Sequence, residues 1–311
     1  MAKHIQDSKI SAAEIRRALE RSGYLLEARV AAELRRSGFD VLANPPYEDP
    51  FTEKSREIDI VATLTEPNFL NDSGSDHLSM QLVMECVNPP QPVAFLTAPV
   101  AATLPSDRSP LSFACLTGWP RHMPLSHPET NWNWLWGHTD LHDRHHYAKC
   151  RIATQFCSFE RKRANNEWFA THREADYESF RALSTAFDYT LRLFYSSDAE
   201  PWTQHSPLQL AAAYPVMVVQ GQILEVRLTR EDFAVSESQH LTFLRSFSHA
   251  GFIHDHLIDV VTEIYFPSYL RMLKKELNRL ATNIRNRNRE LRGILQMNYE
   301  ACRRDPRCWG H

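Results

Sequence analysis

Two strand-like segments in the first third of the chain constrain the fold most, because each carries an acidic side chain among apolar neighbours. Residues 56–64 (REIDIVATL) and 81–87 (QLVMECV) are rich in β-branched or apolar residues, which is typical of strands. Side chains two residues apart share one face of a strand, so Glu85 and Val87 are predicted to point the same way. If the two strands are neighbours, Asp59 and Glu85 converge at one end of a sheet.

The segments on either side predict helices. Residues 11–37 have helical periodicity, with Ser11 and Glu14 as a capping box at the start and Gly38 in the position of a C-terminal cap. Residues 153–195 are also predicted to be helical, because phenylalanine and leucine recur there at helical spacing.

The second half of the chain adds strands and a basic helix. Residues 215–228 predict a β-hairpin, because Gly221 lies between two β-branched stretches. Residues 256–266 predict a strand that leads into a long basic helix over 268–304. The order of elements predicts one mixed α/β domain with a long insertion. The expected parts are a core in two pieces (1–97 and 148–270), an irregular Trp- and His-rich insertion (98–147) and a basic helical C-terminus (271–311).

The composition is that of a soluble globular protein. The 311 residues are 43% apolar and 23% charged, which allows a sizeable core. No apolar run is long enough to span a bilayer, and the N-terminal segment lacks the apolar stretch of a secretory signal. The six cysteines are scattered, which favours free thiols in a reducing, cytoplasmic setting. We therefore expect a cytoplasmic protein that does not interact with membranes.

The positive charge is concentrated at the C-terminus. From residue 271 to 311 there are eleven basic and four acidic residues, a local charge of +7, although the whole chain has a net charge of −3. A basic helix gains affinity for nucleic acid by releasing counterions; the alternative is a solvated helix face or an arm that binds an acidic protein. The candidate phosphate contacts are Arg285, Arg287, Arg289 and Arg292.

A dense run of histidine and cysteine covers residues 138–157. Both residue types bind Zn²⁺, but the run contains no complete set of paired ligands at zinc-site spacing. A polar surface helix is therefore favoured over a zinc site. The residues concerned are His138, His142, His145, His146, Cys150 and Cys157.

The acidic residues and their order resemble the signature of the restriction-endonuclease-like, or PD-(D/E)XK, nucleases. That signature is a helix with a glutamate, a strand with an aspartate, and a strand with E-x-K; here it reads Glu27, Asp59 and Glu85-Cys86-Val87. The resemblance is clearest over residues 22–97. It implies a mixed central sheet flanked by helices, with Glu27, Asp59 and Glu85 as catalytic acids. It also implies Mg²⁺ or Mn²⁺ on Asp59 and Glu85, which suits ions that bind one or two carboxylates and several waters.

The chain departs from the family at Val87, which occupies the position of the catalytic lysine. Valine has no charge and no donor, so it removes electrostatic stabilisation of the transition state. One hypothesis is a metal-dependent DNA nuclease whose lysine lies elsewhere, with Lys162 or Lys149 as candidates. The other is a nuclease-like protein that binds DNA or a partner without cleavage. By family analogy, either protein would act in bacterial defence or genome maintenance, with DNA favoured over RNA.

Overall fold

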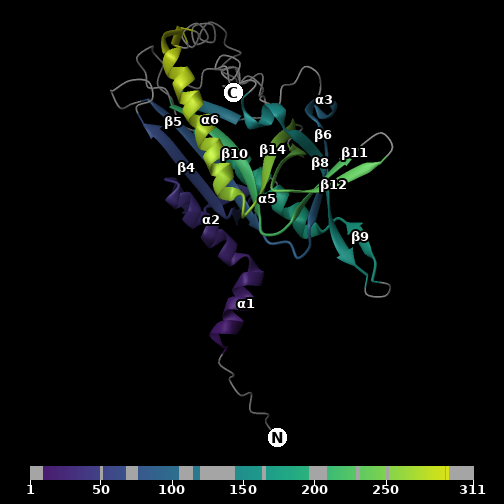
Figure 1. The fold of residues 1–311 in the computed structure, drawn as a ribbon. Coiled ribbons are helices and arrows are strands. Elements are labelled where there is room, and N and C mark those ends of the chain that lie inside the picture. The colour runs from purple at the N-terminus through teal and green to yellow at the C-terminus, as the bar shows by residue number, and fades with distance from the viewer. Residues whose placement is uncertain are drawn as a thin grey trace.

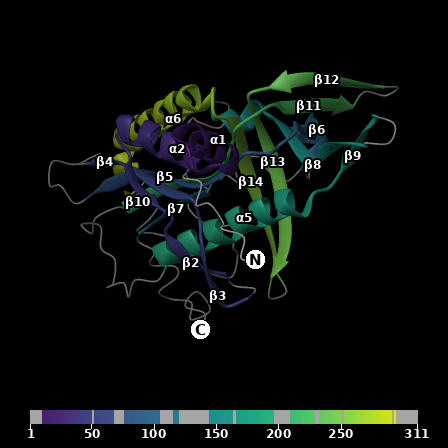
Figure 2. The same cartoon turned by 90° about the horizontal axis from the view of Figure 1, so that it is seen from below.

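The fold is described here from a computed structural model. It covers residues 10–49, 52–67, 76–104, 115–119, 144–162, 166–195, 209–228, 232–249, 252–290 and 292–293. A large mixed sheet forms the centre, with α2 and α6 on one face and α5 on the other (Figures 1 and 2). The expected mixed α/β class is therefore confirmed. None of the helices in the described ranges combines the length and the apolar character needed to cross a bilayer.

The helices are α1 (Ala12–Ser22), α2 (Tyr24–Arg36), α3 (Val100–Thr103), α5 (Glu174–Tyr195) and α6 (Phe266–Asn286), with a 3-10 turn, η3, at His146–Lys149. The first strands are β1 (Asp40–Ala43), β2 (Pro46–Asp49), β3 (Lys54–Glu57), β4 (Ile60–Pro67), β5 (His77–Val87), β6 (Val93–Pro99) and β7 (Cys115–Trp119). The later strands are β8 (Arg151–Arg161), β9 (Trp168–Thr171), β10 (Gln209–Val219), β11 (Ile223–Leu228), β12 (Phe233–Ser238), β13 (His240–His249) and β14 (Phe252–Thr262).

Three parallel strands form the middle of the sheet and end together. The order is β1-β4-β5-β10-β14-β13-β8-β6-β11-β12, and β10 runs parallel to both β5 and β14. Val87, Val219 and Thr262 are in register at the carboxyl ends of these strands. Because β4 is antiparallel to β5, it begins where β5 ends. The start of β4 and the ends of three parallel strands therefore meet at one edge.

Strand β5 separates two apolar cores. Met80, Leu82 and Met84 belong to the core beneath α2 and α6, whereas Val83 belongs to the core beneath α5. This alternation follows from the two-residue period of a strand. Since both faces are covered, the sequence of β5 is nearly continuously apolar, as expected for a strand in a buried parallel sheet.

The N-terminal helical prediction is confirmed, with one break. Ser11 and Glu14 form the expected capping box, and Gly38 has a φ of 85°, the left-handed conformation of a glycine that ends a helix. Gly23 also has a positive φ, of 84°, and divides the segment into α1 and α2. As Figure 1 shows, α1 extends away from the sheet beyond this break.

The helix predicted over 153–195 is wrong in its first half. This region forms strands β8 and β9, and only α5 is helical. The buried side chains of β8 include Ile152, Ala153 and Phe156, and its pairing with β6 shifts register between Leu96 and Thr97. That irregularity spaces the apolar residues of a strand in a way that imitates a helical repeat.

The hairpin predicted over 215–228 is also wrong. β10 pairs with β5, β7 and β14, whereas β11 pairs with β6 and β12. Gly221, with a φ of 141°, lies in the turn between β10, in the middle of the sheet, and β11, which is next to the edge strand β12. The strand predicted over 256–266 is confirmed as the later part of β14, followed by the start of α6.

The predicted insertion and basic helix are corrected where the structure describes them. Within residues 98–147, α3 and β7 are regular, and Trp119 belongs to β7, which pairs with β10. Trp132, Trp134 and Trp136 lie outside the described residues, as do His138 and His142. The C-terminal helix α6 ends at Asn286, and after a turn at Arg287 the described residues 288–290 and 292–293 are helical again. The rest of the helix predicted up to residue 304 lies outside the described ranges.

Candidate functional site

The carboxylate of Asp59 lies at the carboxyl end of β5. Asp59 directly precedes β4, in which Ile60 pairs with Met84, so the next position along β5 is Glu85. Asp59 Oδ2 accepts a hydrogen bond of 2.7 Å from the Cys86 backbone N–H, and the Asp59 carbonyl accepts one of 2.9 Å from Asn44. The predicted arrangement, in which Asp59 and Glu85 converge on neighbouring strands, is confirmed.

Glu27 on α2 belongs to the same cluster of acids. Burial, and then the charge of Asp59, raises the pKa of Glu27. Burial, followed by the charges of Asp59 and Glu27, raises the pKa of Glu85 to about 9. Burial also raises the pKa of Asp59, against the effect of its hydrogen bond from Cys86. Partial burial and the like charges of neighbouring carboxylates therefore both disfavour ionisation in this cluster, most strongly at Glu85.

In the part of the chain that the structure describes, no lysine or arginine forms an ion pair with Glu27, Asp59 or Glu85. The interactions that set the pKa of Asp59 and Glu85 include neither a lysine nor an arginine. Buried carboxylates are normally paired with a cation or coordinate a metal. The cluster is therefore short of positive charge.

A fourth carboxylate, that of Glu263, lies at the same edge of the sheet. Glu263 follows the end of β14, and its backbone N–H donates to the Val219 carbonyl (3.0 Å). Burial and then the charges of Asp59, Glu27, Glu85 and Glu263 raise the pKa of the Cys86 thiol. The charges of four carboxylates therefore act on one thiol.

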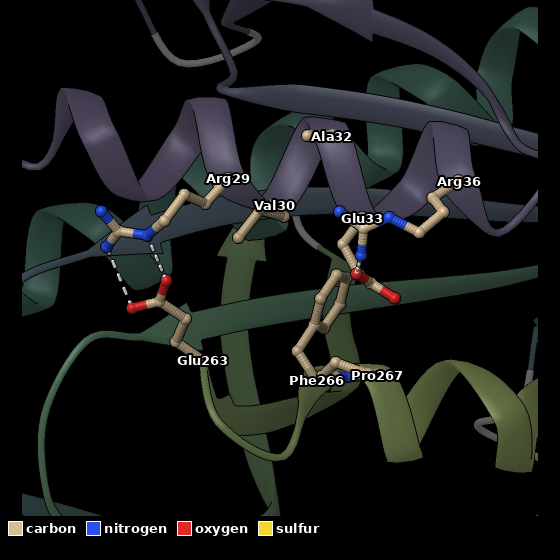
Figure 3. Close-up of a pocket in the computed structure, with 8 residues that line it drawn as sticks. All are labelled: Arg29, Val30, Ala32, Glu33, Arg36, Glu263, Phe266 and Pro267. Carbon is tan, nitrogen blue, oxygen red and sulfur yellow. Dashed lines mark hydrogen bonds and ion pairs between the residues drawn. The ribbon is translucent and has the colours of Figure 1, made fainter.

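Arg29 reaches Glu263 from α2. Its Nε and Nη2 atoms bind the two carboxylate oxygens of Glu263, with the Nη2 contact at 3.0 Å (Figure 3). The pair borders a cavity of about 280 Å³ that is also lined by Glu33, Arg36 and Phe266.

Val87 lies on the face of β5 that is covered by α5. It packs against the core beneath α5 and lines a narrow cavity with Val93, Phe95, Phe180 and Met217. The position expected by resemblance to hold a lysine is therefore occupied by an apolar side chain, in a largely apolar setting that also includes Asp176 and Ser179.

The proposed replacement lysine, Lys162, is not brought to the acids. It lies at the turn between β8 and β9, with Nζ 5.0 Å from the centre of the Phe169 ring. Three strands, β10, β14 and β13, separate β8 from β5 in the sheet. Lys149 belongs to η3.

The four candidate arginines lie towards the other end of β5. Arg292 Nη2 is 3.1 Å from each carboxylate oxygen of buried Asp76, which directly precedes β5. From His77 to Glu85, eight residue steps of a strand span roughly 26 Å. Arg287 binds Glu290, and Arg285 and Arg289 are exposed. The structure thus separates the arginines from the acids.

A second group of polar residues, which sequence reasoning missed, lies buried beneath α6. His146 Nδ1 is 2.8 Å from Glu276 Oε2, and His146 Nε2 is 3.0 Å from Asp259 Oδ2. Burial alone would lower the pKa of His146, but the charges of Asp259 and Glu276 raise it to about 10. His146 is therefore a buried cation held between two carboxylates.

Further donors complete the contacts of Asp259. The hydroxyl groups of Tyr269 and Tyr147 donate to its Oδ2 atom at 2.7 and 3.3 Å, and His240 Nε2 is 3.2 Å from its Oδ1 atom. Although burial favours the neutral acid, His146 and His240 lower the pKa of Asp259. The group fastens α6 and η3 to β14.

His145, His146 and Glu276 have the composition of a zinc site. Among the described residues, theirs is the group whose three ligand atoms all lie within 4.8 Å of one another. However, His145 Nδ1 accepts a hydrogen bond from the Tyr147 backbone N–H (3.1 Å), and burial lowers the pKa of His145 to about 3. A neutral imidazole that accepts at Nδ1 carries its proton on Nε2.

The consequence is that His145 Nε2 donates towards Tyr214 Oη (3.2 Å) and has no lone pair for a metal. Of the remaining run, Cys150 donates to the Tyr147 carbonyl, and Cys157 lies on β8. The expected surface helix is wrong for the described part of this run, since the side chains of His145 and His146 are buried. The aspartate inside the apolar segment HLIDVVTEIYF was the signal that could have indicated a buried polar partner.

Comparison with known proteins adds no relationship. The chain has no match among models of protein families, curated proteins or solved structures.

Proposed function

We propose that this protein binds a divalent metal ion at Asp59 and Glu85, with Glu27 beside them, and acts with it on the phosphodiester backbone of DNA. The observation that supports this most is that the carboxylates of Asp59 and Glu85 come together where β4 begins and β5 ends. Among the described residues, no lysine or arginine forms an ion pair with either of them. A divalent cation would supply the positive charge that the cluster lacks.

The donor set fits Mg²⁺ or Mn²⁺ better than zinc. All candidate ligands are carboxylate oxygens, the donors that hard ions prefer. The carboxylate oxygens of Glu27, Asp59 and Glu85 do not all lie within 4.8 Å of one another. Mg²⁺ keeps several waters and takes one or two protein carboxylates, so the wider spacing is compatible with a hydrated ion.

The residues have separable tasks. A bound divalent ion supplies Lewis-acid stabilisation of a phosphate and lowers the pKa of a water. Asp59 is held in place by the Cys86 N–H, which fixes one carboxylate before a ligand arrives. Glu27 reaches the cluster from α2 and adds negative charge, and Glu85 presents its carboxylate from β5. The resemblance to PD-(D/E)XK nucleases supports DNA as the substrate.

A second candidate function is DNA binding without cleavage. The observation in its favour is that Val87 lies in an apolar cavity and that Lys162 is on the β8–β9 turn. Without a cation beside the attacking water, the transition state loses stabilisation that commonly amounts to about 3 kcal/mol or more. Metal and DNA would then still bind, but the phosphodiester bond would remain intact.

Calorimetric titration with Mn²⁺ tests the proposal. Wild type should give a binding isotherm that Asp59→Asn and Glu85→Gln lose. Glu57→Gln is the matched control, because Glu57 is an exposed acid on β3 and should leave the isotherm unchanged. Equal heats for wild type and all three variants would reject the metal site.

A plasmid-nicking assay with Mg²⁺ or Mn²⁺ separates the two functions. Nicking by wild type that Asp59→Asn abolishes supports metal-dependent cleavage. If wild type binds Mn²⁺ and DNA but leaves the plasmid supercoiled, the binding function is the correct one.

A further inference from the structure

The pair formed by Arg29 and Glu263 points to a further role at this edge of the sheet. We propose that Arg29 is the phosphate-binding cation of the site, supplying from α2 the positive charge that Val87 does not supply from β5. This inference rests on the proposed function, and it assigns the side chain that positions the DNA phosphate.

The position of Glu263 connects Arg29 to the acids. The backbone N–H of Glu263 donates a hydrogen bond to the carbonyl of Val219 at the end of β10. Val219 is in register with Val87 at the end of β5. Two strand spacings, or roughly 10 Å, separate the end of β14 from the end of β5. Arg29 and Glu27 both belong to α2, but side chains two residues apart on a helix point to different sides. Arg29 is therefore connected to this edge of the sheet through Glu263.

The guanidinium is accessible as well as anchored. The Arg29 side chain is 44% exposed, and that of Glu263 is 27% exposed. Figure 3 shows Arg29 reaching across to Glu263 beside the cavity of about 280 Å³. Arginine matches phosphate with a planar fork of donors, and its attachment to Glu263 fixes its direction before DNA arrives.

The helix terminus beside the cavity does not supply this function. At the start of α6, the Phe266 N–H already donates to the Glu263 carbonyl, and the Ser268 N–H donates to the Tyr265 carbonyl. Pro267 has no N–H. The phosphate would therefore be recognised by the side chain of Arg29 and not by the first turn of α6.

Glu263 competes with a phosphate for the same guanidinium. A phosphate bound to the metal would share or displace the Glu263 carboxylate, so Arg29 and Glu263 have opposite effects on DNA affinity. This opposition distinguishes the proposal from a purely structural ion pair, since loss of either partner of a structural pair removes the same contact.

The test is fluorescence anisotropy with a short labelled DNA duplex in Ca²⁺ and, separately, in EDTA. Arg29→Ala should weaken Ca²⁺-dependent binding by about tenfold or more, the loss expected for one charge-assisted contact. Glu263→Gln should strengthen it. Arg36→Ala is the matched control, because Arg36 lies on α2, lines the same cavity and pairs with Glu33; it should bind like wild type.

Calorimetry with Mn²⁺ in the absence of DNA distinguishes failure of the proposed role of Arg29 from failure of the proposed metal site. Arg29→Ala should bind Mn²⁺ like wild type. If it does but its DNA affinity equals that of wild type or of Arg36→Ala, or if Glu263→Gln weakens binding too, the role of Arg29 is refuted and the metal site remains. If wild type shows no Ca²⁺-dependent DNA binding, the role of Arg29 is also refuted. If Asp59→Asn binds Mn²⁺ like wild type, the metal site itself is refuted.

Discussion

The carboxylate of Asp59 is fastened to β5 by a 2.7 Å hydrogen bond from the backbone N–H of Cys86. This contact fixes the start of β4 against the end of β5, beside Glu85. Carboxylates placed this way repel each other when both are charged, and the limited access of water strengthens this repulsion. The arrangement is therefore unfavourable in the absence of a cation, and most of the expectations below follow from that conflict.

The first prediction is that the metal-free protein loses stability as pH rises because of Glu85. Its pKa is raised from 4.5 to about 9, so between these values the folded state binds more protons than the unfolded state. Stability then falls with increasing pH across that window. Glu85→Gln should flatten the slope of unfolding free energy against pH, measured by urea denaturation in EDTA. An unchanged slope, with Glu57→Gln as the control, would show that Glu85 ionises normally.

Introducing a cation at position 87 should change both the charge of the site and its activity. In Val87→Lys the new side chain lies on the Glu85 face, about 7 Å along the strand, and should lower the pKa of Glu85 and increase Mg²⁺-dependent nicking of plasmid. Val87→Ile keeps the apolar packing and should do neither. Melting curves must accompany the assay, since a lysine buried in this cavity would cost several kcal/mol unless it pairs with a carboxylate such as Glu85 or Asp176. A stable Val87→Lys protein with an unaltered Glu85 pKa would contradict the geometry.

The buried cation His146 should be essential for the fold. His146→Gln leaves Asp259 and Glu276 without their shared cation, which should lower the unfolding free energy by about 3–5 kcal/mol. His240→Gln should cost less, because His240 is 18% exposed and contacts Asp259 but not Glu276. Chemical denaturation measures both, and equal small losses would argue against a buried ion triad.

The same triad has a defined pH dependence. The folded pKa of His146 is raised from 6.5 to about 10, so its stabilisation is complete below about 6.5 and is lost as pH rises through 10. Asp259 and Glu276 have lowered pKa values, so their contribution is lost in acid instead. Long-range proton–nitrogen NMR should show a doubly protonated His146 at neutral pH and a neutral His145 with its proton on Nε2. A proton on His145 Nδ1 would reopen the zinc assignment.

The fold and the acid cluster were predictable to different degrees from the sequence. Asp59 and Glu85 could be placed because their strands have an alternating or continuous apolar pattern and a single antiparallel pairing brings them together. The buried group around His146 could not, because it depends on contacts among η3, β14 and α6 that are remote in the chain. Lys162 was misplaced because the irregular spacing of apolar residues in β8 imitates a helix, and Gly221 was misread because a glycine turn does not specify which strands it joins.

The C-terminal arginines should divide into structural and exposed residues. Arg292→Ala removes one partner of buried Asp76 and should lower the unfolding free energy by about 1–3 kcal/mol, whereas Arg289→Ala should have little effect on stability. Thermal melts of the two variants make the comparison. Equal stability of the two variants would show that the ion pair between Arg292 and Asp76 does not stabilise the fold.

The measurement that tests the central claim most directly is an anomalous difference map from crystals soaked in Mn²⁺. The predicted result is a peak between Asp59 and Glu85, at about 2.1 Å from a carboxylate oxygen of each, that is absent from crystals of Asp59→Asn. A map with no peak at these carboxylates, or with its peak at His145, His146 and Glu276 instead, would contradict the account.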